Sequence, residues 1–174
     1  LAEHLLSYAG KTVSMERVNK ICEHKLWKQA VEEISQLEEK RVFCRHNTEH
    51  FLDVARLAYI ENLEKGLGIE KELLYAAALL HDIGRVLEYT EQIPHDKGSV
   101  LLAEKILPEC GFSKEEEREI LAAIPSHRKA DILSENSLSG LLYRADKKSR
   151  ACLFCKAQGT CKWSTEKKNL TLEV

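Results

Sequence analysis

Apolar residues recur along this chain at the three- and four-residue spacing of amphipathic helices, and the alternation typical of strands is scarce. One stretch differs, because Leu73 to Leu80 is apolar on every side, which indicates a helix buried all round. The pattern predicts one or two amphipathic helices in 16–40 and further helices near 48–65, 95–107, 114–124 and 137–149. The expected fold class is therefore all-α, a single helical bundle.

Capping residues and helix breakers set the expected helix ends. Asn47 or Thr48 is the expected N-cap of the helix that runs to about residue 65. Gly84 is expected to end the buried helix. Pro108 and Pro125 are expected just beyond the ends of the two following helices.

The composition fits one soluble domain of 174 residues with 44% hydrophobic content. The net charge of −2 gives no reason to expect bulk nucleic-acid binding. No apolar stretch approaches the ~20 residues of a membrane span, and no signal-peptide pattern is visible, so no membrane contact and a cytoplasmic location are expected. Residues 1–14 could be a leader, vector-derived or native, since the chain begins with Leu1 and its one methionine is Met15. The expected units after them are N-terminal helices in 15–40, a core domain in 41–150 and a cysteine-rich tail in 151–174.

The end of the buried helix carries an imidazole and a carboxylate side by side, His81 and Asp82. A carboxylate in an apolar interior costs several kcal/mol or more unless it is paired, hydrogen-bonded or bound to a metal. The pair therefore points to a cation. The alternative is that Asp82 caps the helix end or pairs with Arg85.

Other histidines and one more aspartate fall at the ends or inward faces of predicted helices. They are His50, His95, His127 and Asp146. Each could be structural when taken alone, but together they suggest convergence on one place. Imidazole and carboxylate ligands without sulfur suit Fe, Mn, Ni, Zn or Mg.

These residues follow the order of the HD-domain superfamily of metal-dependent phosphohydrolases, which the chain resembles from about Val42 to Arg150. The matching pieces are His50-x-x-x-Val-Ala, then His81-Asp82, and then Asp146 in a later helix. The resemblance implies that His50, His81, Asp82 and Asp146 bind one divalent metal.

Some branches of this superfamily, such as the HD-GYP phosphodiesterases and the diadenosine tetraphosphate hydrolases, hold two metals. Their extra ligands come from helix starts, and His95 and His127 occupy such positions here, with Asp82 as the natural bridge. The chain lacks the His-His pair and the Gly-Tyr-Pro of the HD-GYP branch. A cyclic dinucleotide phosphodiesterase is therefore not expected. Whether the site binds one metal or two stays open.

The resemblance implies hydrolysis of a nucleotide or another small phosphoester or phosphoanhydride by metal-activated water. The expected catalytic residues are Asp82, Arg85 and Lys147, with Arg85 standing where relatives often carry a lysine directed at phosphate. Where His95 or His127 is not a ligand, it could supply acid–base help. Further candidates for phosphate contacts, each equally compatible with a solvated surface role, are Arg45, His46, Lys97, Arg128 and Lys147.

Two other functions stay open: a catalytically silent sensor that binds metal and nucleotide, and an oxygenase with a di-iron centre. The phosphohydrolase is preferred because the ligand set is full and Arg85 is present. The expected partner is a small phosphorylated molecule, and a homodimer is compatible with the sequence.

The tail carries Cys152-x-x-Cys155 followed by Cys161, a spacing that lets thiolates converge on one cation. Cys44 is the expected fourth ligand, because it precedes His50 by six residues and Cys152 follows Asp146 by six. Structural zinc is preferred, an iron–sulfur cluster would use the same ligands, and reduced thiols are the remaining option. The tail also resembles that of a group of small bacterial HD-domain proteins of unassigned function.

Overall fold

The computed structural model describes residues 14–172, so residues 1–14, whose origin the sequence leaves open, lie outside it except for Ser14. The described chain forms α-helices and short 3₁₀ turns with no strand, which confirms the all-α prediction. The helices are α1 (Glu16–Glu23), α2 (Lys25–Leu37), α3 (Thr48–Glu64), α4 (Lys71–Leu80), α5 (Arg85–Glu91), α6 (His95–Cys110), α7 (Lys114–Ser126) and α8 (Leu138–Lys148). None of the described helices combines the length and the apolar character needed to cross a membrane.

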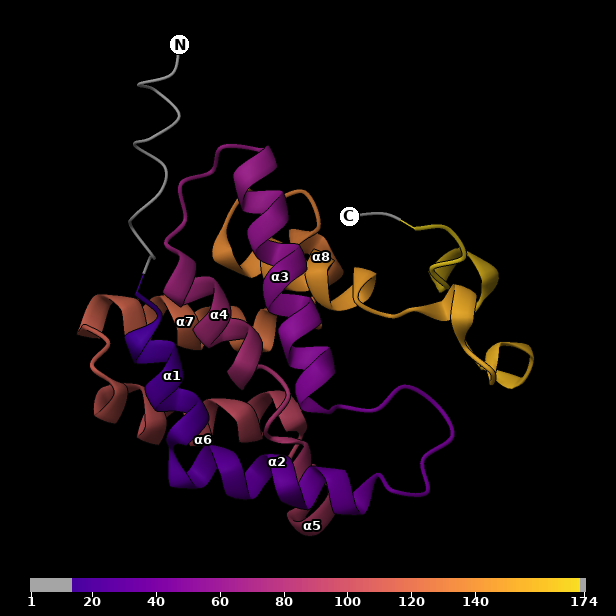
Figure 1. Ribbon diagram of the computed structural model, residues 1–174, viewed down its shortest axis with the longest axis horizontal. Helices are drawn as coiled ribbons and strands as arrows, with labels where there is room; N and C mark the ends of the chain where they lie inside the picture. Colours follow the sequence, from indigo (N-terminus) through magenta and orange to yellow (C-terminus); the bar gives the residue numbers. More distant parts are fainter. Residues whose placement is uncertain (1–13, 173–174) are drawn as a thin grey trace, which may run out of the picture.

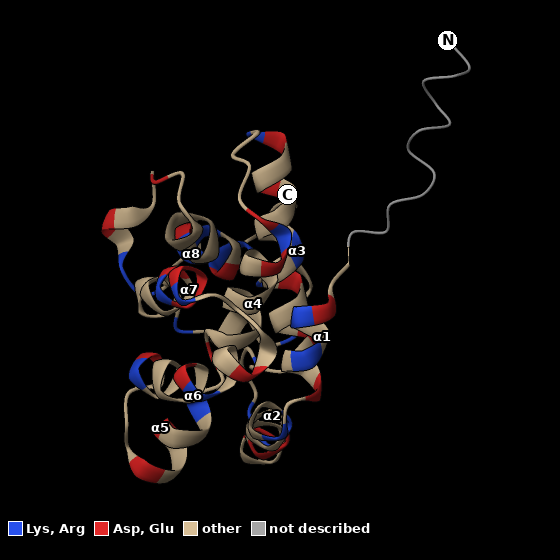
Figure 2. Cartoon of the chain, turned by 90° about the vertical axis from the view of Figure 1, so that its left-hand side faces the viewer, with Lys and Arg blue, Asp and Glu red and all other residues tan. Residues whose placement is uncertain are grey.

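Helix α4 is the centre of the bundle, as its uniformly apolar sequence predicts. Leu73, Leu74 and residues 76–80 are each at most 6% exposed. Helices α1, α3, α6, α7 and α8 all contact α4. Figure 2 shows Lys, Arg, Asp and Glu spread over the surrounding helices, while α4 in their midst is mostly free of charge. This packing fixes the C-terminal end of α4 deep inside the molecule.

A hydrogen bond between helices satisfies the buried end of α4. The indole Nε1 of Trp27 on α2 donates to the carbonyl of Leu79 at 3.0 Å. The last carbonyls of a helix have no partner within that helix, so this contact supplies one where water cannot reach.

The chain after α4 differs from the expectation. Gly84 has a φ of −68°, so it is not a left-handed C-cap, and it precedes α5, a short helix that the sequence analysis missed. A glycine is needed at this position because the backbone of α6 leaves no room for a side chain. A Cβ there would lie 2.1 Å from the backbone nitrogen of Ser99 and 2.2 Å from the carbonyl oxygen of His95, both on α6.

The two prolines lie inside helices, and their expected positions beyond the helix ends were wrong. Pro108 is part of α6, which ends at Cys110, and Pro125 is part of α7, which ends at Ser126. Each proline removes one hydrogen bond in the final turns, but buried residues beside it, Leu107 and Ile124, keep those turns packed. Gly111, with a φ of +89°, provides the actual stop of α6.

The tail leaves the bundle at the C-terminal end of α8. Figure 1 shows it on the same side of the bundle as the loop between α2 and α3. Its end is tied back by Asn169, whose side-chain amide donates to the carbonyls of Lys147, Lys148 and Arg150. The carbonyls of Lys147 and Lys148 belong to the last turn of α8, so Asn169 acts as a cap supplied from the tail.

Candidate metal centre

The six predicted metal ligands come from five separate helix ends or turns and meet beside the end of α4. Each is no more than 6% exposed. They are His50 in the first turn of α3, His81 and Asp82 directly after α4, His95 at the start of α6, His127 directly after α7 and Asp146 in the last turn of α8.

Asp82 stands between two sets of imidazoles and turns one oxygen to each. Its Oδ2 lies 3.8 Å from Nε2 of His50 and 3.4 Å from Nε2 of His81. Its Oδ1 lies 3.6 Å from Nε2 of His95 and 3.7 Å from Nε2 of His127. These separations are too long for good hydrogen bonds. Atoms bound to one ion at 2.0–2.2 Å stand about 3.0–3.6 Å apart, which is close to what is seen.

The ligand atoms fall into two groups that share Asp82, and within each group all of them lie within 4.8 Å of one another. The first group adds the carboxylate of Asp146, whose Oδ1 lies 3.5 Å from Nε2 of His50 and 3.8 Å from Nε2 of His81. The second consists of Asp82, His95 and His127. The structure thus brings together all six histidines and aspartates predicted to bind metal, in the two sets that a bridging carboxylate would join.

The other ring nitrogens are held by outward hydrogen bonds that fix the rings. Nδ1 of His81 donates to the carbonyl of Ala78 at 2.7 Å, and Nδ1 of His127 donates to the carbonyl of Ile124. A carbonyl can only accept, so each Nδ1 carries a hydrogen and Nε2 can present a lone pair to a metal.

The remaining two imidazoles are oriented by side chains. Nδ1 of His95 lies 3.0 Å from a carboxylate oxygen of Glu88. Nδ1 of His50 lies 3.2 Å from Oγ of Ser149, and that hydroxyl donates its own proton to the carbonyl of Asp146 at 2.7 Å. The serine oxygen therefore accepts from His50, which leaves Nε2 of His50 free to bind a cation.

Buried polar atoms without partners show that the residues fit a cation. Nε2 of His81 and Oδ1 of Asp82 are fully buried and have no hydrogen-bond partner. Buried polar atoms in native proteins are nearly always satisfied, so each of these atoms calls for an ion or a water as its partner. The guanidinium of Arg150 lies 3.3 Å from Nε2 of His50 and 3.5 Å from Oδ1 of Asp146. The first group thus already attracts positive charge.

The protonation states of His50, His127 and Asp82 suit metal binding, whereas His81 holds a proton that a metal must displace. Burial lowers the pKa of His50 to about 4 and that of His127 to about 4, so both imidazoles are neutral near neutral pH. Burial alone would raise the pKa of Asp82, but His81 and His50 hold it well below its usual range. Burial opposes a charge on His81 as well, but Asp82 and Asp146 raise its pKa to about 9.

We expect metal binding to depend on pH through His81. A metal must displace the proton that the carboxylates stabilise on this imidazole, so below about pH 9 the proton competes with the metal. Affinity should rise about tenfold per pH unit from about pH 7 to about pH 9 and then level off. Calorimetry in buffers of different ionisation enthalpy should detect about one proton released per chain near neutral pH. Binding with no proton release would contradict this assignment.

His46, expected to contact phosphate, belongs to the centre itself. Its Nε2 lies 3.6 Å from Oδ2 of Asp82, and its Nδ1 lies 2.6 Å from a carboxylate oxygen of Glu38. Glu38 also accepts hydrogen bonds from the backbone N–H of His46 at 2.7 Å and from the hydroxyl of Tyr89 at 2.6 Å. Glu38 was not singled out by the sequence analysis, because a glutamate near the end of an amphipathic helix gives no signal of burial.

Replacing Glu38 by glutamine should lower the free energy of unfolding by about 1–3 kcal/mol, because an amide cannot accept from all three donors. Burial alone would raise the pKa of Glu38, but hydrogen bonds from His46 and Tyr89 lower it to about 2. The wild-type stabilisation is therefore present above pH 4.5 and lost as the pH falls toward about 2. Urea unfolding at neutral pH measures the change, with Glu39→Gln on the exposed neighbour as control. Equal stability of the two variants would contradict a role for the buried carboxylate.

A pocket of about 360 Å³ opens onto the centre, and cationic side chains line it. Four of the predicted phosphate contacts are among its walls: His46, Arg85, Arg128 and Lys147. Arg45 does not line it, since its guanidinium donates to the carbonyls of Glu39 and Arg41. Lys97 is exposed outside it as well. Further cations that the sequence analysis did not consider are Arg41, Arg150 and Lys162.

The family comparison agrees with this geometry. The family described as HD domain matches residues 47–157, nearly two thirds of the chain. The chain belongs to the HD-domain family. His81 and Asp82 are the histidine and aspartate that follow the central helix of this HD domain.

Two relatives and one solved structure are similar to this chain. An uncharacterized protein of Clostridium beijerinckii is 45% identical over 79% of this chain and 85% of its own length. Ribonuclease Y of Oleidesulfovibrio alaskensis is 30% identical over 74% of this chain, which corresponds to 22% of the ribonuclease. A predicted HD superfamily hydrolase from an uncultured Thermotogales bacterium has the same fold, with a TM-score of 0.60, 22% identity and coverage of 84% and 80% of the two chains.

The four cysteines predicted to bind metal lie near the HD centre, but their sulfur atoms are not gathered around one point. Neither group of close ligand atoms in the described chain contains a cysteine. Cys44, Cys152 and Cys155 line one hollow, and Cys161 joins Cys44 in the wall of the pocket over the centre. Cys110 is buried and Cys22 half-buried, which is typical of free cysteines that pack as small hydrophobic residues. The four-cysteine metal site stays a prediction.

Proposed function

We propose that this HD domain is a phosphohydrolase that uses two divalent cations to cleave a small phosphorylated molecule. The observation that carries the proposal is Asp82, whose two oxygens face two separate sets of imidazoles at the floor of a cationic pocket. Two cations held in this way would activate water as the nucleophile and polarise the phosphoryl group. The metals that suit these ligands are Fe, Mn, Ni, Zn or Mg.

The cationic side chains of the pocket bind and orient the phosphate. Arg85 lies with its Nε 3.5 Å from Oδ1 of Asp82, and this nitrogen is buried without a hydrogen-bond partner. Lys147 donates to Oδ2 of Asp146 at 2.7 Å, so its ammonium lies next to the metal ligands. Arg128, half-exposed at the rim, pairs with Asp96 and can turn its guanidinium toward the oxygens of an entering phosphate.

The walls of the pocket favour a nucleotide as substrate. Six lysines and arginines line the pocket. One phosphate cannot contact all six, so this set of cations suits a chain of phosphates. Phe43 and Trp163 line the same pocket, and each is 37% exposed. Flat aromatic faces of this kind stack on nucleobases. The site therefore combines a phosphate-binding floor with a surface for a base.

A metal and substrate screen tests the proposal. The purified protein is incubated with Mn, Co, Ni or Mg and with nucleoside mono-, di- and triphosphates, dinucleoside polyphosphates and a short RNA. We expect phosphate or nucleotide release from the small substrates. Cleavage of RNA alone would favour a nuclease like the Ribonuclease Y relative. Binding without turnover would favour a sensor, and oxygen uptake by the iron form would favour an oxygenase.

Replacing Arg128 by glutamine should raise the KM for a nucleotide about 10- to 100-fold, because a charge-assisted hydrogen bond is lost. The matched control is Arg118→Gln, on the exposed face of α7 and paired with Glu115. Steady-state kinetics of both variants measure the effect. An equal KM in the two variants would place the phosphate elsewhere.

A further inference from the structure

The tail has almost no hydrophobic core of its own. Among residues 151–172, Cys152 alone is buried, while Phe154 is 69% and Leu172 is 79% exposed. So little apolar burial contributes little to holding the tail in one conformation, and small units with so small a core gain stability from a disulfide or a metal. A metal held by its cysteines would add to the hydrogen bonds by which Asn169 ties the end of the tail to α8.

The backbone of the tail forms tight turns that turn its cysteines toward the same side. The N–H of Cys155 donates to the carbonyl of Cys152 at 3.1 Å, within the 3₁₀ turn η3 (Cys152–Phe154). Side chains three residues apart in such a turn lie on the same side. A second turn, η4 (Gln158–Thr160), then reverses the chain, and the N–H of Cys161 donates to the carbonyl of Gln158.

Cys44, on the loop between α2 and α3, faces these tail thiols. Cys44, Cys152 and Cys155 line one hollow together with Arg150, and Cys44 and Cys161 line the pocket over the HD centre. Burial raises the pKa of the Cys44 thiol, and Arg150 lowers it. Arg41 holds the loop in place by donating to the carbonyl of Cys44 at 2.8 Å. Cys44 is therefore the fixed point toward which the tail thiols turn.

We propose that Cys44, Cys152, Cys155 and Cys161 bind one zinc ion that clamps the tail onto the α2–α3 loop at the mouth of the HD pocket. Each thiol gives up a proton to bind, and four thiolates around Zn²⁺ leave a net charge of −2 beside the Arg150 guanidinium. Zinc–sulfur distances of 2.3 Å place the sulfurs about 3.8 Å apart. No three of the sulfurs lie within 4.8 Å in the described chain, so zinc binding draws the tail inward.

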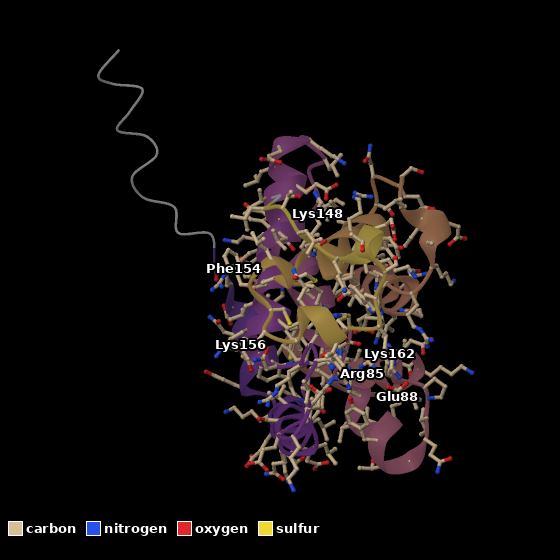
Figure 3. All side chains as sticks on the ribbon, turned by 90° about the vertical axis from the view of Figure 1, so that its right-hand side faces the viewer. Arg85, Glu88, Lys148, Phe154, Lys156 and Lys162 are labelled. Carbon is tan, nitrogen blue, oxygen red and sulfur yellow. The ribbon has the colours of Figure 1, made fainter. Side chains whose placement is uncertain are left out.

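The clamp would position residues next to the pocket. Lys162 and Trp163 follow Cys161 directly and line the pocket over the HD centre. Figure 3 shows Lys162 near Arg85, while Phe154 and Lys156, which precede Lys162 in the tail, lie on the left of the view. Drawing Cys161 toward Cys44 therefore sets how one cation and one aromatic ring of the pocket wall are held. This site does not depend on whether the HD centre hydrolyses phosphate.

Metal content and proteolysis test the clamp. Metals and sulfide are measured in the wild-type protein, in Cys155→Ser and in Asp82→Asn, which should lose the metals of the HD centre alone. We expect about one zinc per chain to persist in Asp82→Asn and to be lost in Cys155→Ser. Trypsin should then cut after Lys156 or Lys162 at least about tenfold faster in Cys155→Ser, because the open tail is more populated.

The matched control is Cys22→Ser, a half-buried thiol on α1, which should keep both the zinc and the slow cleavage. Circular dichroism checks the helices of each variant, and Cys161→Ser should repeat the result of Cys155→Ser. Unchanged zinc in Cys155→Ser, iron with sulfide in its place, or no thiolate-bound metal in the wild-type protein would each overturn the proposal. Loss of zinc with unchanged proteolysis would overturn the clamp.

Discussion

Replacing Asp82 by alanine should remove metal from both positions of the HD centre at once. One carboxylate serves both ligand groups, with Oδ2 toward His50 and His81 and Oδ1 toward His95 and His127. Losing a partner that merely orients a ligand already weakens metal binding 10- to 100-fold, so losing a shared direct ligand should cost more than about 100-fold at each position. Hydrolysis should fall to below about 1% of wild type. Metal analysis and phosphate release measure the two effects.

Two further variants separate metal binding from folding. Asp82→Asn keeps the shape of the side chain and removes its charge, so it should lose metal while its helices stay intact. Asp53→Ala, on the exposed face of α3 where Asp53 pairs with Arg56, should leave metal and activity unchanged. A variant of Asp82 that retained metal at either position would show that the ligand groups are not joined by this residue.

The metal centre could be predicted because its residues stand at positions where a charged or polar side chain is unusual and can be recognised in the sequence. A charged pair ending a wholly apolar helix is costly without a cation, so His81 and Asp82 stand out without any structure. His50, His95 and Asp146 fall at helix ends or on inward faces. The helical spacing of apolar residues and the capping residues reveal such positions in the sequence. Helix ends around a buried helix must lie close together in so small a bundle, so these residues could be expected to meet.

The surroundings of the centre were harder to predict because they depend on contacts between distant segments. The sequence of α5 is short and weakly patterned, and it folds where α2 and α6 cover it. Glu38 is buried because His46 and Tyr89 donate to it, and neither contact can be inferred from spacing. Arg45 was a reasonable phosphate candidate by charge, but its guanidinium is held by carbonyls of its own loop.

Close backbone packing between the turn after α4 and the start of α6 places His95 against Asp82. Gly84 has no side chain, and its N–H donates to Oγ of Ser99 at 2.9 Å. Gly98 faces it from α6, where a Cβ would lie 3.0 Å from the carbonyl oxygen of Gly84. The second ligand group therefore rests on a backbone contact that two small residues make possible.

Replacing Gly84 by alanine should destabilise the fold by about 3 kcal/mol or more and selectively disturb the second metal position. The φ of −68° suits alanine, so the cost is purely steric: the new Cβ would lie 2.1 Å from the nitrogen of Ser99 and 2.2 Å from the carbonyl oxygen of His95. Backbone atoms cannot swing away, so the first turn of α6 must shift and carry His95 from Asp82, while the group that contains Asp146 keeps its ligands. Urea unfolding and metal content measure both effects, with Gly159→Ala, whose Cβ would meet nothing within 4 Å, as the control. Equal stability of the two variants, or loss of both metals together, would show that His95 is not positioned by this contact.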